Sequence, residues 1–181
     1  LMENIRKESL NRKLQPEGVF LDKCIQLFET TVVRHGLMLV GPTGGGKTRT
    51  QEVLSAAMSN LDGVGDFTKV RKHVLNPKAI TMVQLYGQFD DATHEWTDGI
   101  AAAMVRMCAS DDKADHHWLV FDGPVDAIWI ENMNTVLDDN KKLCLVSGEI
   151  IQLTPRMNIL FEVEDLAVAS PATVSRCGMV Y

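Results

Sequence analysis

The sequence predicts an α/β domain built on a parallel five-stranded sheet with helices on both faces. Three observations support this fold class. Short apolar runs suited to buried strands alternate with segments whose apolar residues recur at helical spacing. A glycine-rich turn joins the first of these runs to a helix. The length of 181 residues, of which 45% are hydrophobic, suffices for one such domain with a buried core.

The first strand is expected at 36–40 (GLMLV), directly before the turn GPTGGGKT at 41–48. After the turn, apolar residues at positions 53, 54, 57, 58 and 61 repeat as one face of a helix. A strand, a glycine turn and a helix in this order are the context in which G-x-x-x-x-G-K-[ST] indicates a phosphate-binding loop, and a P-loop NTPase fold, rather than a surface turn.

The remaining elements follow the same alternation. Further strands are expected at 73–76, 118–121, 158–163 and 179–181. Helices are expected around 81–86, around 100–107 and over 125–137, and the segment 170–178 connects the last two strands. The stretch KLCLVSGEIIQL (142–153) contains two apolar runs around Ser-Gly, which predicts an inserted β-hairpin.

The glycine turn carries the predicted nucleotide contacts. Its residues are Gly41, Pro42, Thr43, Gly44, Gly45, Gly46, Lys47 and Thr48. Backbone N–H groups at a helix start attract anions, so phosphates are expected there. Lys47 is expected to reach the β- and γ-phosphates, and the Thr48 hydroxyl to bind Mg²⁺. The pattern therefore predicts ATP or ADP with Mg²⁺ as cofactors.

Asp122 is the expected second Mg²⁺ residue, acting through water. It ends the apolar run WLVF at 118–121, and a neighbouring parallel strand brings its terminal carboxylate to the same sheet edge as the loop. The alternative is that Asp122 caps a helix that begins near Pro124.

The residue after Asp122 is Gly123, and this glycine argues against hydrolysis. ATPases of this layout typically have a Glu at this position, which orients or deprotonates the attacking water. Glycine cannot accept a proton, and losing a general base lowers a rate by about 10²–10⁴. Asp126 and Glu131 are nearby acids that leave a self-sufficient ATPase open as the rival function.

Arg176 precedes the last expected strand, which is expected at the far edge of the sheet from the glycine turn. An arginine there that points away from its own loop can act as an arginine finger for the γ-phosphate of a neighbouring subunit. From spacing alone, an exposed or salt-bridged arginine is the favoured alternative.

Several classes are disfavoured. A net charge of −6 gives no basic footprint for nucleic acid, and no apolar run approaches the roughly 18 residues of a membrane span. The four cysteines form no C-x-x-C pair, which predicts reduced thiols in a cytosolic compartment without a zinc site or disulfides. The stretches 94–98 and His116-His117 are expected in surface loops without a metal role. A GTPase is disfavoured because the sequence lacks the Asp that recognises guanine. A small-molecule kinase is disfavoured because the sequence shows no arginine-rich lid.

Longer stretches resemble one family. GLMLVGPTGGGKT (36–48), VLNPKAITMVQLYGQFD (74–90), FDGPVDAIWIENMN (121–134), LDDNK (137–141) and SPATVSRCGM (170–179) together resemble the dynein heavy chain. More narrowly they are similar to the second AAA+ module of its motor ring, in the axonemal branch. The resemblance implies that 1–181 is a single large α/β subdomain of AAA+ type, without the small helical lid.

The resemblance also implies roles for residues. The second module is expected to bind ATP without appreciable turnover, while the first does the main hydrolysis. Arg176 matches the finger offered to the preceding module, and 14–20 (LQPEGVF) match a segment that packs on the adenine. Glu164 matches the polar sensor position on the fourth strand.

Partners and location follow from the same resemblance. The expected partners are the adjacent AAA+ modules of the same heavy chain, the microtubule through the whole motor, and dynein intermediate and light chains. The expected location is the cytoplasmic cytoskeleton, in the axoneme of a cilium or flagellum. Neither nucleic acid nor a membrane is an expected partner.

Overall fold

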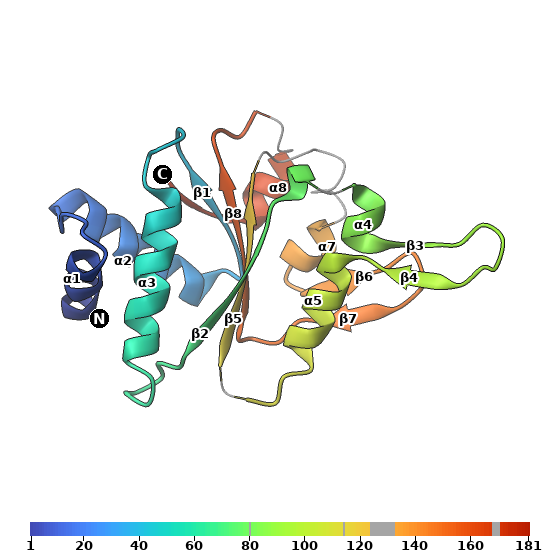
Figure 1. The fold of residues 1–181 in the computed structure, drawn as a ribbon, viewed down its shortest axis with the longest axis horizontal. Coiled ribbons are helices and arrows are strands. Elements are labelled where there is room, and N and C mark those ends of the chain that lie inside the picture. The colour runs from blue at the N-terminus through green and yellow to red at the C-terminus, as the bar shows by residue number, and fades with distance from the viewer. Residues whose placement is uncertain (80, 114, 124–132, 168–170) are drawn as a thin grey trace.

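The computed structural model describes residues 1–79, 81–113, 115–123, 133–167 and 171–181 (Figure 1). The helices are α1 (Met2–Asn11), α2 (Gly18–Val33), α3 (Lys47–Asn60), α4 (Met82–Tyr86), α5 (Ile100–Ala109), α7 (Asn134–Leu137) and α8 (Pro171–Arg176), with a 3₁₀ turn at Pro77–Ala79. The strands are β1 (Gly36–Val40), β2 (Val70–Leu75), β3 (Gly87–Phe89), β4 (Trp96–Asp98), β5 (His116–Asp122), β6 (Lys142–Cys144), β7 (Ile150–Gln152), β8 (Met157–Val163) and β9 (Gly178–Val180).

The central sheet has five parallel strands, as the sequence predicts, and their order is β2-β5-β8-β1-β9. Strands β1 and β8 are buried along their whole length, which explains why β1 is a continuous apolar run and why β8 is apolar apart from Asn158 and Glu162. Because β1 lies between β8 and the edge strand β9, the loop that follows it emerges next to the carboxyl end of β8, and β5 is one strand further on.

Helices cover both faces of this sheet. Figure 1 shows α1, α2 and α3 on one side and α4, α5, α7 and the small hairpins on the other. Alternate residues of β5 serve the two cores, since Trp118 packs with the α1–α3 side while Phe121 packs with the α5 side. Trp118 is completely buried, so truncating it to Ala would cost about 3–5 kcal/mol of stability.

The predicted hairpin over 142–153 is confirmed, with Leu143 opposite Ile151 in an antiparallel pair. Its turn uses Gly148 at φ +91°, a conformation that favours glycine. A second hairpin, β3–β4, was not predicted, so the expectation of a surface loop at 94–98 is wrong for Trp96–Asp98. Its strands are too short to show an alternating pattern; Trp96 packs edge-on against Phe89.

The expected surface loop at His116-His117 is also wrong. Both residues belong to β5, and His117 is only 5% exposed. Sequence reasoning missed this because the apolar run that defines β5 begins only at Trp118, while the two histidines gain partners from other segments. Thr68 bonds the His116 ring, and Asp111 bonds the His117 ring.

Other boundaries differ by a few residues. Helix α3 begins at Lys47, immediately after the glycine turn, and β2 begins at Val70 rather than at 73. The segment expected to connect the last two strands contains the short helix α8. Of the helix predicted over 125–137, residues 133–137 are described, and Asn134–Leu137 form α7. Within the described part of the chain, no helix has the length and apolar character needed to cross a membrane.

Candidate nucleotide site

The turn between β1 and α3 has the geometry that a phosphate-binding loop needs. Gly44 and Gly46 have φ values of +80° and +90°, which side chains with a Cβ rarely adopt. A Cβ on Gly45 would lie 2.9 Å from the carbonyl oxygen of Pro42, to which the Gly45 N–H donates. The three glycines therefore permit a tight turn that ends in the first residues of α3, a 14-residue helix.

A cavity of about 770 Å³ opens over this turn. It is lined by residues 43–49, by Asp122 and Gly123 after β5, and by residues 162–165 at the end of β8. The carboxyl ends of three parallel strands thus meet at one concave site, the usual location of ligands in open α/β sheets.

Lys47 links the end of the turn to its beginning through hydrogen bonds. Its ammonium group donates hydrogen bonds to the carbonyl oxygens of Gly41 and Pro42, the latter at 3.1 Å. Gly41 and Pro42 do not line the cavity themselves, unlike the other six residues of the predicted loop. An ammonium group held by carbonyl dipoles at this position can turn to a phosphate oxygen, which carries a full negative charge.

Asp122 and Thr48 lie at the same end of the cavity, together with a third residue that the sequence analysis missed. Glu162 of β8 is in register with Asp122 of β5, and its Oε2 accepts a hydrogen bond of 2.7 Å from the Thr48 hydroxyl. Glu162 is only 3% exposed. Burial raises the pKa of its carboxyl group, and the nearby Asp122 acts in the same direction, although the Thr48 hydrogen bond opposes them.

One signal could have found Glu162: it is the only charged residue in the stretch NILFEV, whose other residues except Asn158 are apolar. A charged side chain in a strand buried on both faces needs a polar partner. Glu164, the expected sensor, lies just beyond the end of β8. It lines the cavity, and its carboxylate accepts a hydrogen bond from Thr43 in the glycine turn.

The oxygen atoms gathered here fit Mg²⁺. A hydroxyl and two carboxylates are hard oxygen donors, the class that Mg²⁺ prefers, and phosphate oxygens and water would complete its octahedral shell. An ion bound here would be held by Thr48 and Asp122, directly or through water, while the Glu162 carboxylate accepts the hydrogen bond of the Thr48 hydroxyl.

Gly123 lines the cavity directly after Asp122. Its φ of +154° and a Cβ position only 2.9 Å from Asn76 Oδ1 make any side chain here strained. The backbone N–H of Gly123 donates to the carbonyl oxygen of Glu162. The alternative bases Asp126 and Glu131 lie outside the described residues.

Arg176 ends α8 and does not line the cavity. The strand after it, β9, is an edge strand as expected, but that edge is next to β1, the strand that leads into the glycine turn. The segment 14–20 leads into α2, where Leu14 and Phe20 pack against the core on the α1–α3 side.

Comparison with protein families gives two matches. A model described as "AAA domain (dynein-related subfamily)" matches residues 36–177. A second, described as "Hydrolytic ATP binding site of dynein motor region", matches residues 1–48, and this match ends before Asp122 and Gly123.

Similar proteins align with the whole chain. Dynein axonemal heavy chain 1 of Homo sapiens is 63% identical over 186 residues, and dynein axonemal heavy chain 6 of Homo sapiens is 54% identical over 186. Dynein axonemal heavy chain 3 of Mus musculus is 56% identical over 183 residues. These alignments cover 100% of this chain and 4% of each relative, so the chain corresponds to a small part of those proteins.

Proposed function

Because the chain belongs to the dynein-related subfamily of AAA domains, we propose that it is a nucleotide-holding module of an axonemal dynein motor. In this proposal the glycine turn binds the phosphates of ATP, Lys47 neutralises the β- and γ-phosphates, and Thr48 and Asp122 hold Mg²⁺. Residues 14–20 would pack on the adenine. The cavity over the turn supports this assignment because it brings all of these phosphate and metal groups to one place.

The module is proposed to hydrolyse ATP slowly or not at all. The observation that carries this proposal is Gly123, which follows Asp122 in the cavity wall and offers no side chain to activate water. Without a general base, a rate would fall by about 10²–10⁴. Bound ATP would then fix the shape of this part of the motor instead of driving a cycle.

The place in the motor is proposed from the resemblance together with the site. The chain would be the second of six AAA+ modules in a ring, with Arg176 offered to the nucleotide of the preceding module. Its position outside its own cavity supports a role toward a neighbour. The partners would be the adjacent modules, the microtubule through the whole motor, and the intermediate and light chains, in the axoneme of a cilium or flagellum.

Single-turnover ADP formation tests the proposal. The measurement uses a polypeptide that extends from this chain through the following module, with its other nucleotide sites inactivated. We expect tight ATP binding with negligible ADP, and a gain in the Gly123→Glu variant. Since any side chain at position 123 is strained, Gly123→Ala is the matched control: it carries the same backbone cost without a carboxylate. Turnover typical of an ATPase, about 10 s⁻¹, in the unchanged sequence would contradict the proposal.

A second candidate function rests on Glu162. A buried carboxylate beside Thr48, with a raised pKa, has the properties of a general base, and it would make the module a self-sufficient ATPase. The variant Glu162→Gln separates the two functions, because it keeps the shape and the hydrogen-bond acceptor for Thr48. If Glu162 is the base, ADP formation by the unchanged sequence is measurable and falls by about 10²–10⁴ in the variant.

A further inference from the structure

A group of side chains typical of transition-metal sites lies on the α5 side of the sheet, away from the nucleotide cavity. His73 comes from β2, His117 from β5, and Cys108 from the last turn of α5. The ligand atoms of the three residues all lie within 4.8 Å of one another. His73 and His117 share a face because β2 and β5 are paired, with His73 opposite Leu119.

One ring nitrogen of His73 lies close to one ring nitrogen of His117. His73 Nε2 lies 3.2 Å from His117 Nδ1, and the rings are stacked with centroids 5.4 Å apart. Two nitrogen ligands at about 2.0–2.1 Å from a tetrahedral Zn²⁺ are about 3.3 Å apart. The observed spacing is therefore that of two neighbouring ligands on one ion.

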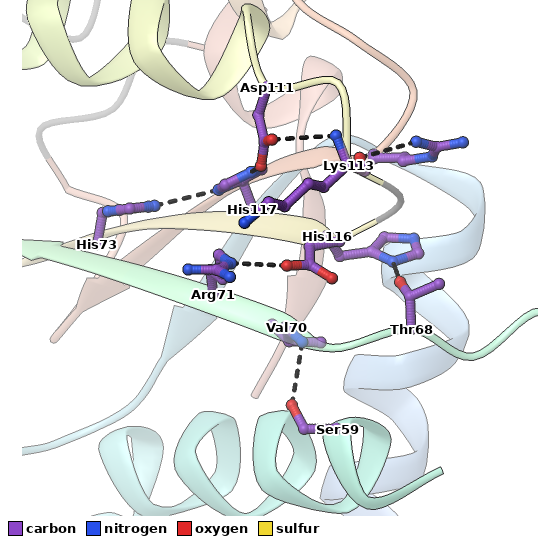
Figure 2. A network of polar contacts seen from close by, with 11 residues as sticks. Ser59, Thr68, Val70, Arg71, His73, Asp111, Lys113, His116 and His117 are labelled. Carbon is purple, nitrogen blue, oxygen red and sulfur yellow. Dashed lines mark hydrogen bonds and ion pairs between the residues drawn. The ribbon is translucent and has the colours of Figure 1, made fainter. Parts of the chain in front are cut away.

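Asp111 orients His117 from its other side. Figure 2 shows the His117 ring between His73 and Asp111. The Asp111 Oδ2 lies 2.7 Å from His117 Nε2, and its Oδ1 accepts a hydrogen bond from the backbone N–H of Lys113. With the His117 proton on Nε2, the lone pair of Nδ1 is directed toward His73. A carboxylate that fixes the tautomer of a histidine ligand in this way is a regular feature of zinc sites.

The surroundings suit a partly enclosed ion. His117 and Cys108 are 5% and 1% exposed. A cavity of about 260 Å³ borders Cys108, Asp111 and His117, and continues to Arg156. Three protein ligands leave a fourth position, and water from this cavity can occupy it.

We propose that His73, Cys108 and His117 bind a divalent transition metal ion, Zn²⁺ by the chemistry of its donors, with Asp111 as a positioning residue. Two imidazole nitrogens and a thiolate select Zn²⁺ over Mg²⁺ or Ca²⁺, which prefer oxygen. The ion would join an edge strand, a central strand and a covering helix at one point. This site is independent of the proposed nucleotide function.

A nitrogen and a sulfur ligand of one Zn²⁺ are about 3.6 Å apart. Because the three ligand atoms already lie within 4.8 Å of one another, binding requires at most a small adjustment of the side chains. The thiol must also lose its proton on binding. The competing explanation is a metal-free polar network, in which Asp111, His117 and His73 are linked by hydrogen bonds and Cys108 is an ordinary core residue.

Titration of the metal-stripped 181-residue chain with Co²⁺, and then with Zn²⁺, tests the site. Tetrahedral Co²⁺ with a thiolate ligand gives intense visible bands and a sulfur-to-metal charge-transfer band in the near ultraviolet. We expect one equivalent of Co²⁺ with both features, displacement by one equivalent of Zn²⁺, and a higher midpoint of thermal unfolding with Zn²⁺.

Matched variants assign the ligands. Cys108→Ser should abolish the charge-transfer band, and His73→Gln and His117→Gln should each weaken Co²⁺ binding at least about tenfold. The controls are Cys144→Ser and His94→Asn, which alter an exposed cysteine and an exposed histidine and should change nothing. Asn suits position 94 because the backbone there has φ +57°.

His73 is only half-buried and lies on an edge strand, so His73→Gln keeps the test decisive if a core variant fails to fold. Circular dichroism confirms the fold of each variant. The proposal is overturned if no stoichiometric Co²⁺ binding occurs, if binding persists unchanged in His73→Gln and Cys108→Ser, or if Cys144→Ser removes it.

Discussion

The glycine turn after β1 and the group of His73, Cys108 and His117 under α5 are two polar sites on one sheet. They differ in whether their residues are consecutive in the sequence or come from separate elements. The consecutive residues 43–49 make about half of the cavity lining at the first site, at the carboxyl ends of the strands. The second takes single residues from three elements, and its His117 lies near the amino end of β5. Asp122 lies five positions after His117, roughly 17 Å along the strand.

The difference concerns what fixes the geometry. In the glycine turn, backbone conformations such as φ +80° at Gly44 are local properties, and the phosphate-binding shape is encoded within the segment. In the other group, the contact between His73 and His117 exists only because β2 pairs with β5 in one register. A shift of that register by one residue would turn one of the histidines to the opposite face.

The largest expected effect is the loss of ATP affinity on replacing Lys47, a change that should leave Co²⁺ binding at the other site unaltered. A hydrogen bond to a charged group contributes about 1.5–3 kcal/mol, so Lys47→Ala should weaken ATP binding about 10–150-fold. Isothermal titration calorimetry with MgATP measures this change, and Co²⁺ titration of the same variant should match the unchanged chain. Lys142→Ala is the matched control, because it removes an exposed lysine of β6. Equal loss in both variants would mean that net charge, not the glycine turn, binds the nucleotide.

This contrast also explains how much the sequence could predict. The five-stranded sheet and the 142–153 hairpin follow from apolar runs, and their prediction is confirmed. Glu162 was missed because its partners, Thr48 and Asp122, are brought to it by strand order, which local patterns do not contain. The histidines of β5 were assigned to a loop for the same reason: their partners, such as Asp111, lie outside the strand that holds them.

Replacing Asp111 should give the second largest effect, confined to the other site. Changing a residue that orients a metal ligand typically lowers affinity about 10–100-fold, so Asp111→Asn should weaken Co²⁺ binding within that range while the thiolate band remains at saturation. A merely structural role would lower stability without changing affinity, so unfolding in urea without metal is measured alongside. Asp112→Asn is the control, since Asp112 is an exposed neighbour. Unchanged Co²⁺ affinity in Asp111→Asn would remove Asp111 from the proposed site.

A third histidine, His35, belongs to neither site, and replacing it should have the smallest effect. His35 precedes β1, is half-buried, and donates from Nε2 to the carbonyl oxygen of Val136. Burial lowers the pKa of His35 below its ordinary value of 6.5. The unfolded chain therefore binds this proton more readily than the folded chain, so His35 protonation destabilises the fold as the pH falls below about 6.5. His35→Gln removes this titration, and the urea unfolding free energy should decline less steeply between about pH 7 and pH 5 than in the unchanged chain or in His94→Asn.

Co²⁺ and ATP binding should stay unchanged in His35→Gln, because His35 bonds a backbone carbonyl group that belongs to neither site. An unchanged pH slope would show that His35 protonation is not coupled to folding.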